Sequence, residues 1–554
     1  LLNNMLKQRK SAEKVREYHQ RASKWHHNHG SLEEAMFHAI AAKDFEGAAV
    51  MIEQNIAGMF MRSEVPVFLG WIEKLPEEIL HNRPWIDIYR ANTLALASQL
   101  DEVDPLLDGV ENRIDPGAPQ SAALLGHIAA IRAYSANLRG DHEGVIKMSQ
   151  RARHNLPETH TIAHWMAAYA LADACFARDD MEAASKELQD MVRVGQHTGQ
   201  LILSVPALCD LAAVRKVQGQ LNQAEELYAR AHHLMVAHKG LDSRVRCSYE
   251  FGLADLLRER NQLDQAYQHA NIGLELRQRL GGFLMVGDLV LMRILQARGD
   301  LDGAMEALRD AEKYMQTYPF QMAVTLEFKT ARVAQCLALG DVETASQWAD
   351  ACDGGSELEQ IVLARLRLAQ GNTADILRLL ELQRDHAREG GRKGRLIEIL
   401  GLLAIAQSAQ GQPNQAEATL SQALALARPE GFKRVFLDMG PPLYSLLEQI
   451  VPPDTPVSSP SLTDAYVHDL RNAFHLQDQA AGAPTLSHGL FNQLTDREKD
   501  VLRLLAEGLT NKQIASQLVV APSTIKQHLK NIFRKLDVHS RTQAVARGRD
   551  FNLL

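Results

Sequence analysis

The chain has 554 residues, 46% of them hydrophobic, so it is long enough for several domains or for one long repeat array with a sizeable core. Its net charge is −8, but residues 491–554 hold 11 Lys and Arg against 6 Asp and Glu, which leaves −13 on the rest of the chain. A basic terminal module on an acidic body favours nucleic-acid binding at the C-terminal end and argues against it elsewhere.

The five cysteines are scattered without a CxxC pair, a sparse usage that favours a reducing cytoplasm over a disulfide framework. No apolar run approaches the length of a membrane span, and no signal peptide is visible at the start. We therefore expect a cytoplasmic chain that makes no membrane contact. Because it opens with Leu1 rather than Met, we also expect it to be a fragment of a longer protein.

Residues 1–90 read as helices that lead into the repeats. Ser31 and Glu34 have the spacing of a capping box, in which a hydroxyl and a carboxylate satisfy backbone N–H groups at a helix start. Three histidines lie within residues 26–29, but no acidic residue or cysteine lies at ligand spacing from them, so we expect no metal site.

Residues 91–451 repeat a pattern of helix, turn and helix. In the clearest unit, RKVQGQLNQAEELYARAHHL, Gly219 breaks one helix and Ala224 lies on the inner face of the next. The breaker recurs every 31 to 42 residues, at Gly140, Asp179, Gly219, Asn261, Gly299, Gly340, Gly371 and Gly411. This period, with a small residue five positions after the turn, predicts stacked helix hairpins that are similar to tetratricopeptide (TPR) repeats but longer.

A single hairpin cannot bury its own apolar face, so we expect one superhelix with a concave surface for a ligand or partner. The aromatic residues Tyr134, Trp165, Tyr169, Tyr249 and Trp348 could stack on a sugar or line a groove. At helical spacing, core positions are the favoured interpretation, and the cysteines likewise read as small buried hydrophobes.

Residues 452–490 are rich in Pro, Ser, Ala and Gly. This composition predicts a flexible linker with one short helix, from about residue 461 to residue 474.

Residues 491–554 read as four short helices. Capping-box spacing marks three starts, at Thr495 with Glu498, Thr510 with Gln513, and Ser540 with Gln543. Gly508 suits the left-handed end of the first helix.

The remaining helix begins at Pro522 and carries two contrasting faces. Its apolar residues form one stripe at helical spacing: Ile525, Leu529, Ile532, Phe533 and Leu536. The opposite face carries donors and cations: Ser523, Lys526, Gln527, Lys530 and Arg534. Such a helix is suited to the DNA major groove, although the lysines taken alone would read as a solvated face.

Three sequence segments in this region match a known family pattern: LTDREKDVLRLLAEGLTNKQIASQL, STIKQHLKNIFRKL and RTQA. Together they resemble the helix-turn-helix domain of LuxR-type transcription factors over residues 494–549, with Ile525 for the usual Val and Ala521 for the usual Ser cap. The resemblance implies that Lys526, Gln527 and Lys530 reach base edges. Other implied DNA-binding positions lie near phosphates or support the helix: Thr524, His528, Asn531, Arg534 and Lys512.

Members of this family often self-associate on DNA through the last helix. The resemblance therefore implies contacts between copies through Ala544, Val545 and Ala546.

Two further segments, WIEKLPEEILHNRPW and GFKRVFLDMGPPLYSLLEQI, resemble parts of large MalT-like regulators. In that family an ATPase module precedes the repeats. This chain has no GxxxxGK[ST] run and no Gly-Lys dipeptide, so ATP would belong to a module outside it, and we expect no cofactor here.

We expect an all-α fold, in which a superhelical array of TPR-like hairpins precedes a four-helix LuxR-type helix-turn-helix domain. The resemblance implies a sequence-specific transcriptional activator that binds promoter DNA and RNA polymerase and whose repeats sense an inducer or a partner protein. The alternative is an interaction scaffold whose helix-turn-helix does not read DNA. An enzyme is not expected, because nucleophile-elbow, metal-cluster and dinucleotide motifs are missing from the sequence.

Overall fold

A computed structural model gives the structure of the chain in two compact units, Leu1–Phe474 and His475–Leu554. The first is described over residues 11–61, 65–81, 83–97, 99–157, 159–199, 201–237, 243–278, 286–317, 320–352, 354–372, 374–450 and 462–474. The second is described over residues 475–482, 496–506, 508–518 and 543–545 and at residues 525, 529, 532 and 541.

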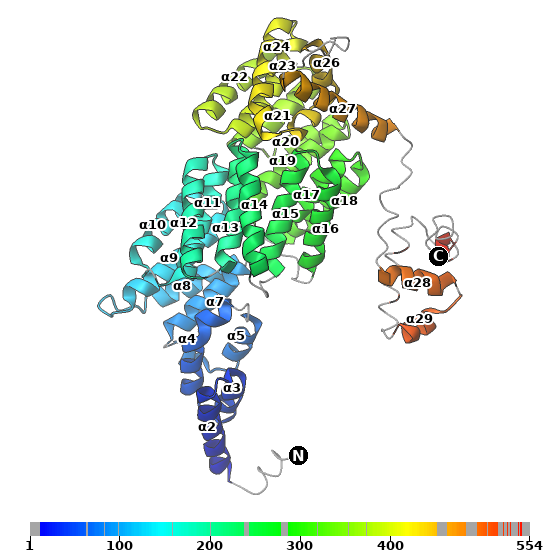
Figure 1. Cartoon of the computed structure of the whole chain (residues 1–554). Helices are drawn as coiled ribbons and strands as arrows, with labels where there is room; N and C mark the ends of the chain where they lie inside the picture. Colours follow the sequence, from blue (N-terminus) through cyan, green and yellow to red (C-terminus); the bar gives the residue numbers. More distant parts are fainter. Residues whose placement is uncertain are drawn as a thin grey trace. The chain divides into compact units, whose positions relative to one another are not determined.

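The described residues form helices and turns, and none of them lies in a β-strand, which confirms the all-α prediction. Among the described residues, seven helices precede the regular repeats: α2 (Ala12–Asn28), α3 (Leu32–Ala41), α4 (Phe45–Met61), α5 (Val65–Ile72), α6 (Glu77–His81), α7 (Pro84–Leu96) and α8 (Leu100–Glu111). Eight hairpins follow in chain order (Figure 1): α9 (Ser121–Arg139) with α10 (His142–Asn155), α11 (Thr161–Ala177) with α12 (Met181–His197), α13 (Leu201–Val217) with α14 (Leu221–Ala237), α15 (Ser243–Glu259) with α16 (Leu263–Gln278), α17 (Val286–Ala297) with α18 (Leu301–Thr317), α19 (Met322–Ala338) with α20 (Val342–Ala349), α21 (Glu357–Ala369) with α22 (Ala374–Glu389), and α23 (Lys393–Ala409) with α24 (Pro413–Ala427). After the hairpins come η1 (Arg428–Glu430), α25 (Arg434–Leu437), α26 (Pro441–Ile450) and α27 (Leu462–Gly482), whose residues after Phe474 belong to the second unit.

Each predicted breaker lies in the turn of one hairpin, and all eight adopt the left-handed conformation, with φ between 61° and 81°. Side chains other than glycine rarely tolerate this region, although Asp and Asn visit it more readily than most. Asp179 and Asn261 are the two breakers that are not glycine, with φ of 63° and 61°. The predicted hairpin turns are therefore confirmed.

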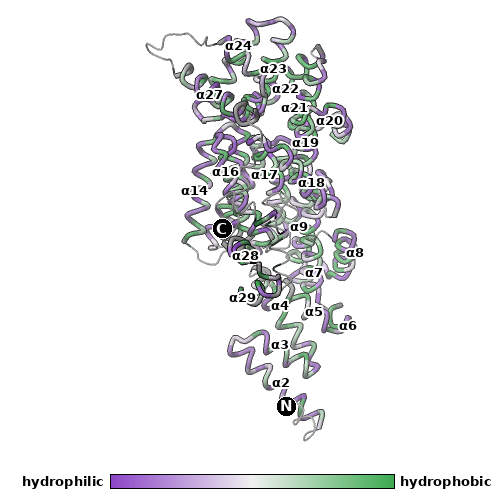
Figure 2. The backbone as a smooth tube through the Cα atoms, turned by 90° about the vertical axis from the view of Figure 1, so that its right-hand side faces the viewer, coloured by the Kyte–Doolittle hydropathy of each residue, from purple (hydrophilic) through white to green (hydrophobic). Residues whose placement is uncertain are grey.

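The position five residues after each breaker packs the second helix against the first. Six of these residues are alanine and two are larger, and each is at most 1% exposed: Val145, Ala184, Ala224, Ala266, Ala304, Ala345, Ile376 and Ala416. A small side chain there lets the helix axes approach closely. Hydrophobic and hydrophilic residues alternate along the helices of the array (Figure 2), as helices that bury one face require.

Aspartates cap the second helix of several hairpins. The carboxylate of Asp141 accepts the backbone N–H of Gly144 at 2.9 Å, and the same bond recurs at Asp180, Asp300 and Asp341. Ser31, which we expected to cap α3, has nearly the same backbone conformation as Asp141 but makes no such bond, so this prediction is wrong. The hydroxyl of Ser356 does accept the N–H of Glu359 at 3.2 Å, but Ser356 has an extended ψ of 156°, whereas ψ of Ser31 is 78°.

The superhelix brings hairpins that are far apart in the sequence into contact. The carboxylate of Asp179, in the second turn, accepts the backbone N–H of Glu357 at the start of α21, at 2.8 Å. The side-chain oxygen of Asn261, in the fourth turn, accepts from Arg434 in α25 at 3.3 Å. Between them, the end of α13 touches the start of α23. Turns of the second to fourth hairpins therefore dock on helix starts about five hairpins further along.

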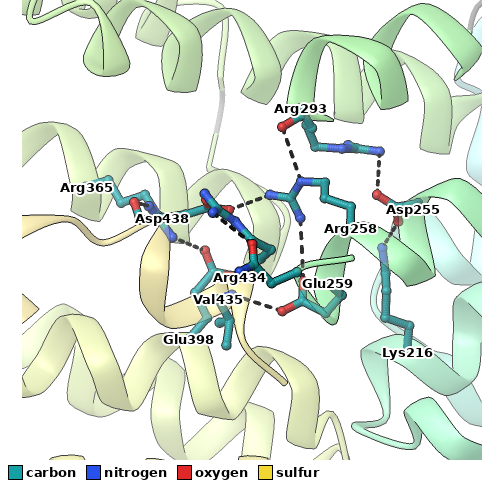
Figure 3. A network of polar contacts seen from close by, with 11 residues as sticks. Lys216, Asp255, Arg258, Glu259, Arg293, Arg365, Glu398, Arg434, Val435 and Asp438 are labelled. Atoms are coloured by element: carbon teal, nitrogen blue, oxygen red, sulfur yellow. Dashed lines mark hydrogen bonds and ion pairs between the residues drawn. The ribbon is translucent and has the colours of Figure 1, made fainter. Parts of the chain in front are cut away.

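A network of ion pairs joins these stacked parts (Figure 3). Arg258 of α15 and Arg434 of α25 both pair with Asp438. Asp255 of α15 pairs with Lys216 of α13 and, at 3.4 Å, with Arg293 of α17. Burial acts to raise the pKa of the Asp438 carboxyl, but the neighbouring guanidinium groups outweigh burial and hold that pKa below its ordinary value.

The aromatic residues divide between core and surface. Tyr134 and Tyr249 are each 8% exposed, as a core position predicts. Trp165 and Tyr169 are half-buried and stack on each other with ring centroids 5.0 Å apart. Trp348 is 36% exposed, so the core interpretation is wrong for this residue, and the guanidinium of an arginine covers its ring instead. All five cysteines are buried, as predicted.

Helix α27 corrects part of the predicted linker. It extends eight residues beyond the short helix that we expected to end near residue 474. Its apolar residues Tyr466, Val467, Leu470 and Phe474 are buried in the core of the first unit, and the hydroxyl of Tyr466 donates to the carbonyl of Phe432. The short helix predicted inside residues 452–490 is therefore present, and its buried face packs on the array.

Candidate nucleic-acid interface

The second unit has its own hydrophobic core. It is built from helices α28 (Asp496–Ala506) and α29 (Asn511–Gln517) and from four further residues. The buried members are Val501, Leu502, Leu504, Leu505, Ile514, Ala515, Ile525, Leu529, Ile532 and Ala544. Leu509, Leu518 and Val545 pack against this core from the side.

A sharp turn joins α28 to α29. Gly508 adopts φ of 85°, and its N–H donates to the carbonyl of Leu505 at 3.0 Å, which ends α28 in the predicted left-handed cap. Thr510 and Gln513 then form the predicted capping box: the backbone N–H of Thr510 donates to the Gln513 side chain at 2.8 Å, and the N–H of Gln513 donates back to the Thr510 hydroxyl at 3.4 Å. These bonds set where α28 ends and where α29 begins.

Three described residues of the expected DNA-reading helix are helical and buried. Ile525, Leu529 and Ile532 are 0%, 5% and 0% exposed, and all three belong to the core made with α28 and α29. Their spacing of four and three residues is that of one helix face. The predicted apolar stripe is therefore confirmed at these three positions.

Arg541 ties the last part of the unit to the turn, a role that our sequence analysis missed. Its guanidinium donates to the carbonyl of Leu509 at 2.7 Å and to the side-chain oxygen of Asn511 at the start of α29. Arg541 is the first residue of the RTQA run, which our sequence analysis singled out. Its partners lie about thirty residues earlier, and no local sequence pattern connects them to it.

Ala544 corrects our expectation for self-association. It is 0% exposed and lies inside the core, so its side chain is not available to another copy, whereas Val545 packs against that core and stays partly exposed. Ala546 lies outside the described residues. The side chain of Ala544 is used to close the core of the unit itself.

None of the eight predicted DNA-contacting side chains is among the described residues. Those outside them are Thr524, Lys526, Gln527, His528, Lys530, Asn531 and Arg534. Lys512 lies in α29, but its side chain is also outside the description. Thr495 and Ser540, the first members of the other two expected capping boxes, are outside it too.

The described parts of the chain hold no group of three His, Cys, Asp or Glu side chains arranged for a metal ion. Among the described helices, none combines the length and the apolar character that crossing a membrane requires.

Two family descriptions match the chain. Residues 126–452 match the MalT-like TPR region, and residues 492–547 match the bacterial regulatory proteins of the luxR family. Neither is an enzyme family.

Two solved structures are similar to the chain. One is a Rap protein in complex with competence and sporulation factor, with 14% identity over 63% of this chain and 99% of that chain, and a TM-score of 0.47. The other is the APC/C hetero-tetramer Cut9–Hcn1, with 11% identity over 83% of this chain and 96% of that chain, and a TM-score of 0.41.

A TPR-like superhelix followed by a LuxR-type helix-turn-helix defines a class of DNA-binding transcription regulators. The chain belongs to the MalT-like family of these LuxR-type regulators.

Proposed function

We propose that this regulator is a cytoplasmic transcriptional activator whose C-terminal unit reads promoter DNA and whose repeat array senses an inducer or a partner protein. The observation that carries the proposal is the burial of Ile525, Leu529 and Ile532 against α28 and α29. At 3.6 residues per helical turn, the spacing assigns Lys526, Gln527 and Lys530 to the face opposite these three residues, and we propose that this face binds in a DNA groove.

That face supplies the chemistry of base recognition. We assign base-edge contacts to Lys526, Gln527 and Lys530, because lysine donates to guanine O6 and N7 and glutamine pairs with adenine. We assign contacts with DNA phosphates, or support of the helix, to five further residues: Thr524, His528, Asn531, Arg534 and Lys512. The net charge of +5 over residues 491–554 adds the electrostatic attraction to phosphates that DNA binding needs.

Selection from a random duplex library tests this reading of DNA with the full chain at fixed salt. The expected result is enrichment of one short motif, in two-fold or tandem half-sites if the protein self-associates on DNA. The double variant Lys526→Ala/Lys530→Ala should lose the enrichment. The matched double variant Lys147→Ala/Lys186→Ala, on exposed positions of α10 and α12, should keep it. No enriched motif with the unchanged chain, or the same motif with both variants, contradicts the proposal.

Activation is tested separately from binding. Transcription by purified RNA polymerase from a template that carries the selected motif should rise when the chain is added, because an activator recruits or remodels polymerase at the promoter. A fall in transcription would make the protein a repressor instead. Either result leaves the DNA-reading role intact.

The alternative function is an interaction scaffold. The observation that favours it is the stacked array itself, since superhelical repeats present extended surfaces that bind proteins. Under this alternative, the Lys526→Ala/Lys530→Ala variant would bind DNA as well as the unchanged chain does.

A further inference from the structure

A cleft opens on the array between the second and third hairpins. It has a volume of about 520 Å³ and lies where α12 and α14 flank α13, three neighbouring helices in the middle of the array (Figure 1). Pockets that hold small organic ligands commonly measure about 300–1,000 Å³. The cleft is therefore large enough for one small molecule.

The floor of the cleft is apolar. Leu208 and Leu211 of α13 and Val192 of α12 form it, and these side chains are 0%, 5% and 6% exposed. They belong to the largest hydrophobic core of the first unit, so the floor is packed from behind and cannot collapse into the opening. An apolar group placed on this floor would be shielded from water.

The rim of the cleft is polar and cationic. Arg193, His197, Gln189 and Gln196 reach it from α12, and Arg230 reaches it from α14. Among the eight lining residues there is no Asp or Glu, although the chain outside residues 491–554 carries a net charge of −13. A cleft lined only by positive and neutral groups in an acidic body attracts anions selectively.

The rim arginines are available to a ligand. Arg193 pairs with Asp190 at 2.8 Å, but the two side chains are 77% and 51% exposed, so the pair is weak and is easily exchanged for a better partner. Arg230 is exposed, and it has no hydrogen-bond or ion-pair partner among the described residues. Arginine binds carboxylates, phosphates and sulfonates through two parallel N–H donors.

We propose that this cleft binds a small amphiphilic anion, with its apolar body on Leu208, Leu211 and Val192 and its acidic group between Arg193 and Arg230. This proposal rests on the sensing role in the proposed function. It adds the chemical class of the molecule that the array senses. The binding site itself is tested without DNA, so its failure is distinguishable from a failure of DNA reading.

The test measures dye binding to the full chain by fluorescence. The anionic probe is 8-anilinonaphthalene-1-sulfonate, and the matched neutral probe is N-phenyl-1-naphthylamine, which has the same apolar body without the sulfonate. We expect the anionic dye to bind at least about tenfold more tightly than the neutral one, because charge-assisted hydrogen bonds are roughly twice as strong as neutral ones. The double variant Arg193→Gln/Arg230→Gln should bring the anionic dye to the affinity of the neutral dye.

Two further variants separate the cleft from other apolar surface. Lys186→Gln removes a positive charge from α12 outside the cleft and should leave the affinity for the anionic dye unchanged. Gln196→Trp fills the opening and should abolish saturable binding of both dyes. Thermal unfolding of each variant establishes that it folds.

Octanoate and octyl phosphate then compete with the anionic dye, and displacement by one of them identifies the preferred acidic group. Equal affinity of the two dyes for the unchanged chain, unchanged binding by Arg193→Gln/Arg230→Gln, full binding by Gln196→Trp, or displacement by neither competitor would overturn the proposal.

Discussion

Gly394, at the start of α23, lies directly against the backbone carbonyl of Lys216, near the end of α13. A Cβ atom on Gly394 would come within 2.4 Å of that oxygen and within 2.9 Å of the carbonyl oxygen of Val217. The contact joins the third hairpin to the eighth. It shows that the array is a superhelix whose successive turns touch, and that backbone meets backbone at the joint.

Replacing Gly394 by alanine should therefore destabilise the array. The methyl group meets backbone atoms that cannot rotate away, and overpacking of this kind typically costs about 1–3 kcal/mol. The measurement is the free energy of unfolding in urea. The matched control is Gly109→Ala in α8, where a Cβ meets nothing within 4 Å and alanine should be neutral or stabilising by up to about 1 kcal/mol. Equal effects of the two substitutions would show that the joint is not close-packed.

The hairpin turns have a different sensitivity. Gly140 has open space around it but adopts φ of 75°, so Gly140→Ala introduces strain without any clash. We expect a loss of about 1–2 kcal/mol in the free energy of unfolding, the cost of placing an L-residue in the left-handed region. The same urea titration checks it, again beside Gly109→Ala. An unchanged midpoint would mean that this turn can be rebuilt without a positive φ.

The local parts of the fold could be predicted from the sequence because each has a local cause. The residue type and the repeat period predict the positive φ at Gly140 and the other breakers. The three-residue spacing of Thr510 and Gln513 predicts their capping box. The contact of Gly394 with Lys216 has no such signal, because it depends on how many hairpins complete a superhelical turn. The same holds for Arg541, whose partners are distant in the chain.

Asp210 makes the array sensitive to pH. Burial, and after it the nearby charge of Asp173, raises the pKa of the Asp210 carboxyl to about 7. Asp210 has no hydrogen-bond or ion-pair partner among the described residues that would offset the burial. A raised pKa in the folded state means that the folded chain favours the protonated form. The protonated Asp210 carboxyl therefore contributes to the free energy of unfolding. This contribution is fully present below the pKa of an unfolded Asp, about 4, and is lost as the pH rises through the folded-state pKa of about 7.

Asp210→Asn removes this titration. The free energy of unfolding of the unchanged chain should fall by about 2–3 kcal/mol relative to that of the variant between pH 5 and pH 8. Urea unfolding at several pH values measures both curves, and groups common to both proteins cancel in the difference. Parallel curves over this range would contradict the assignment.

Arg541 should hold the DNA-binding unit together without touching a base. Arg541→Ala removes two hydrogen bonds to the α28–α29 turn, each worth roughly 0.5–1.5 kcal/mol or more for a charged donor. We expect a lower unfolding temperature for the second unit and weaker binding to all DNA sequences alike. The control is Arg503→Ala, which removes an exposed arginine 3.8 Å from Asp500 and should change neither property. A change in sequence preference with Arg541→Ala would show that this residue reads bases.

The affinity of the full chain for its selected DNA motif, measured at two salt concentrations, tests the central claim most directly. Lys526→Ala/Lys530→Ala should lose at least about tenfold in affinity and should discriminate less against mismatched bases, because each good base contact contributes about 1–3 kcal/mol of discrimination. Lys147→Ala/Lys186→Ala should match the unchanged chain. If all three proteins bind the motif equally and with the same salt dependence, the helix that carries Ile525, Leu529 and Ile532 is not the DNA-reading element.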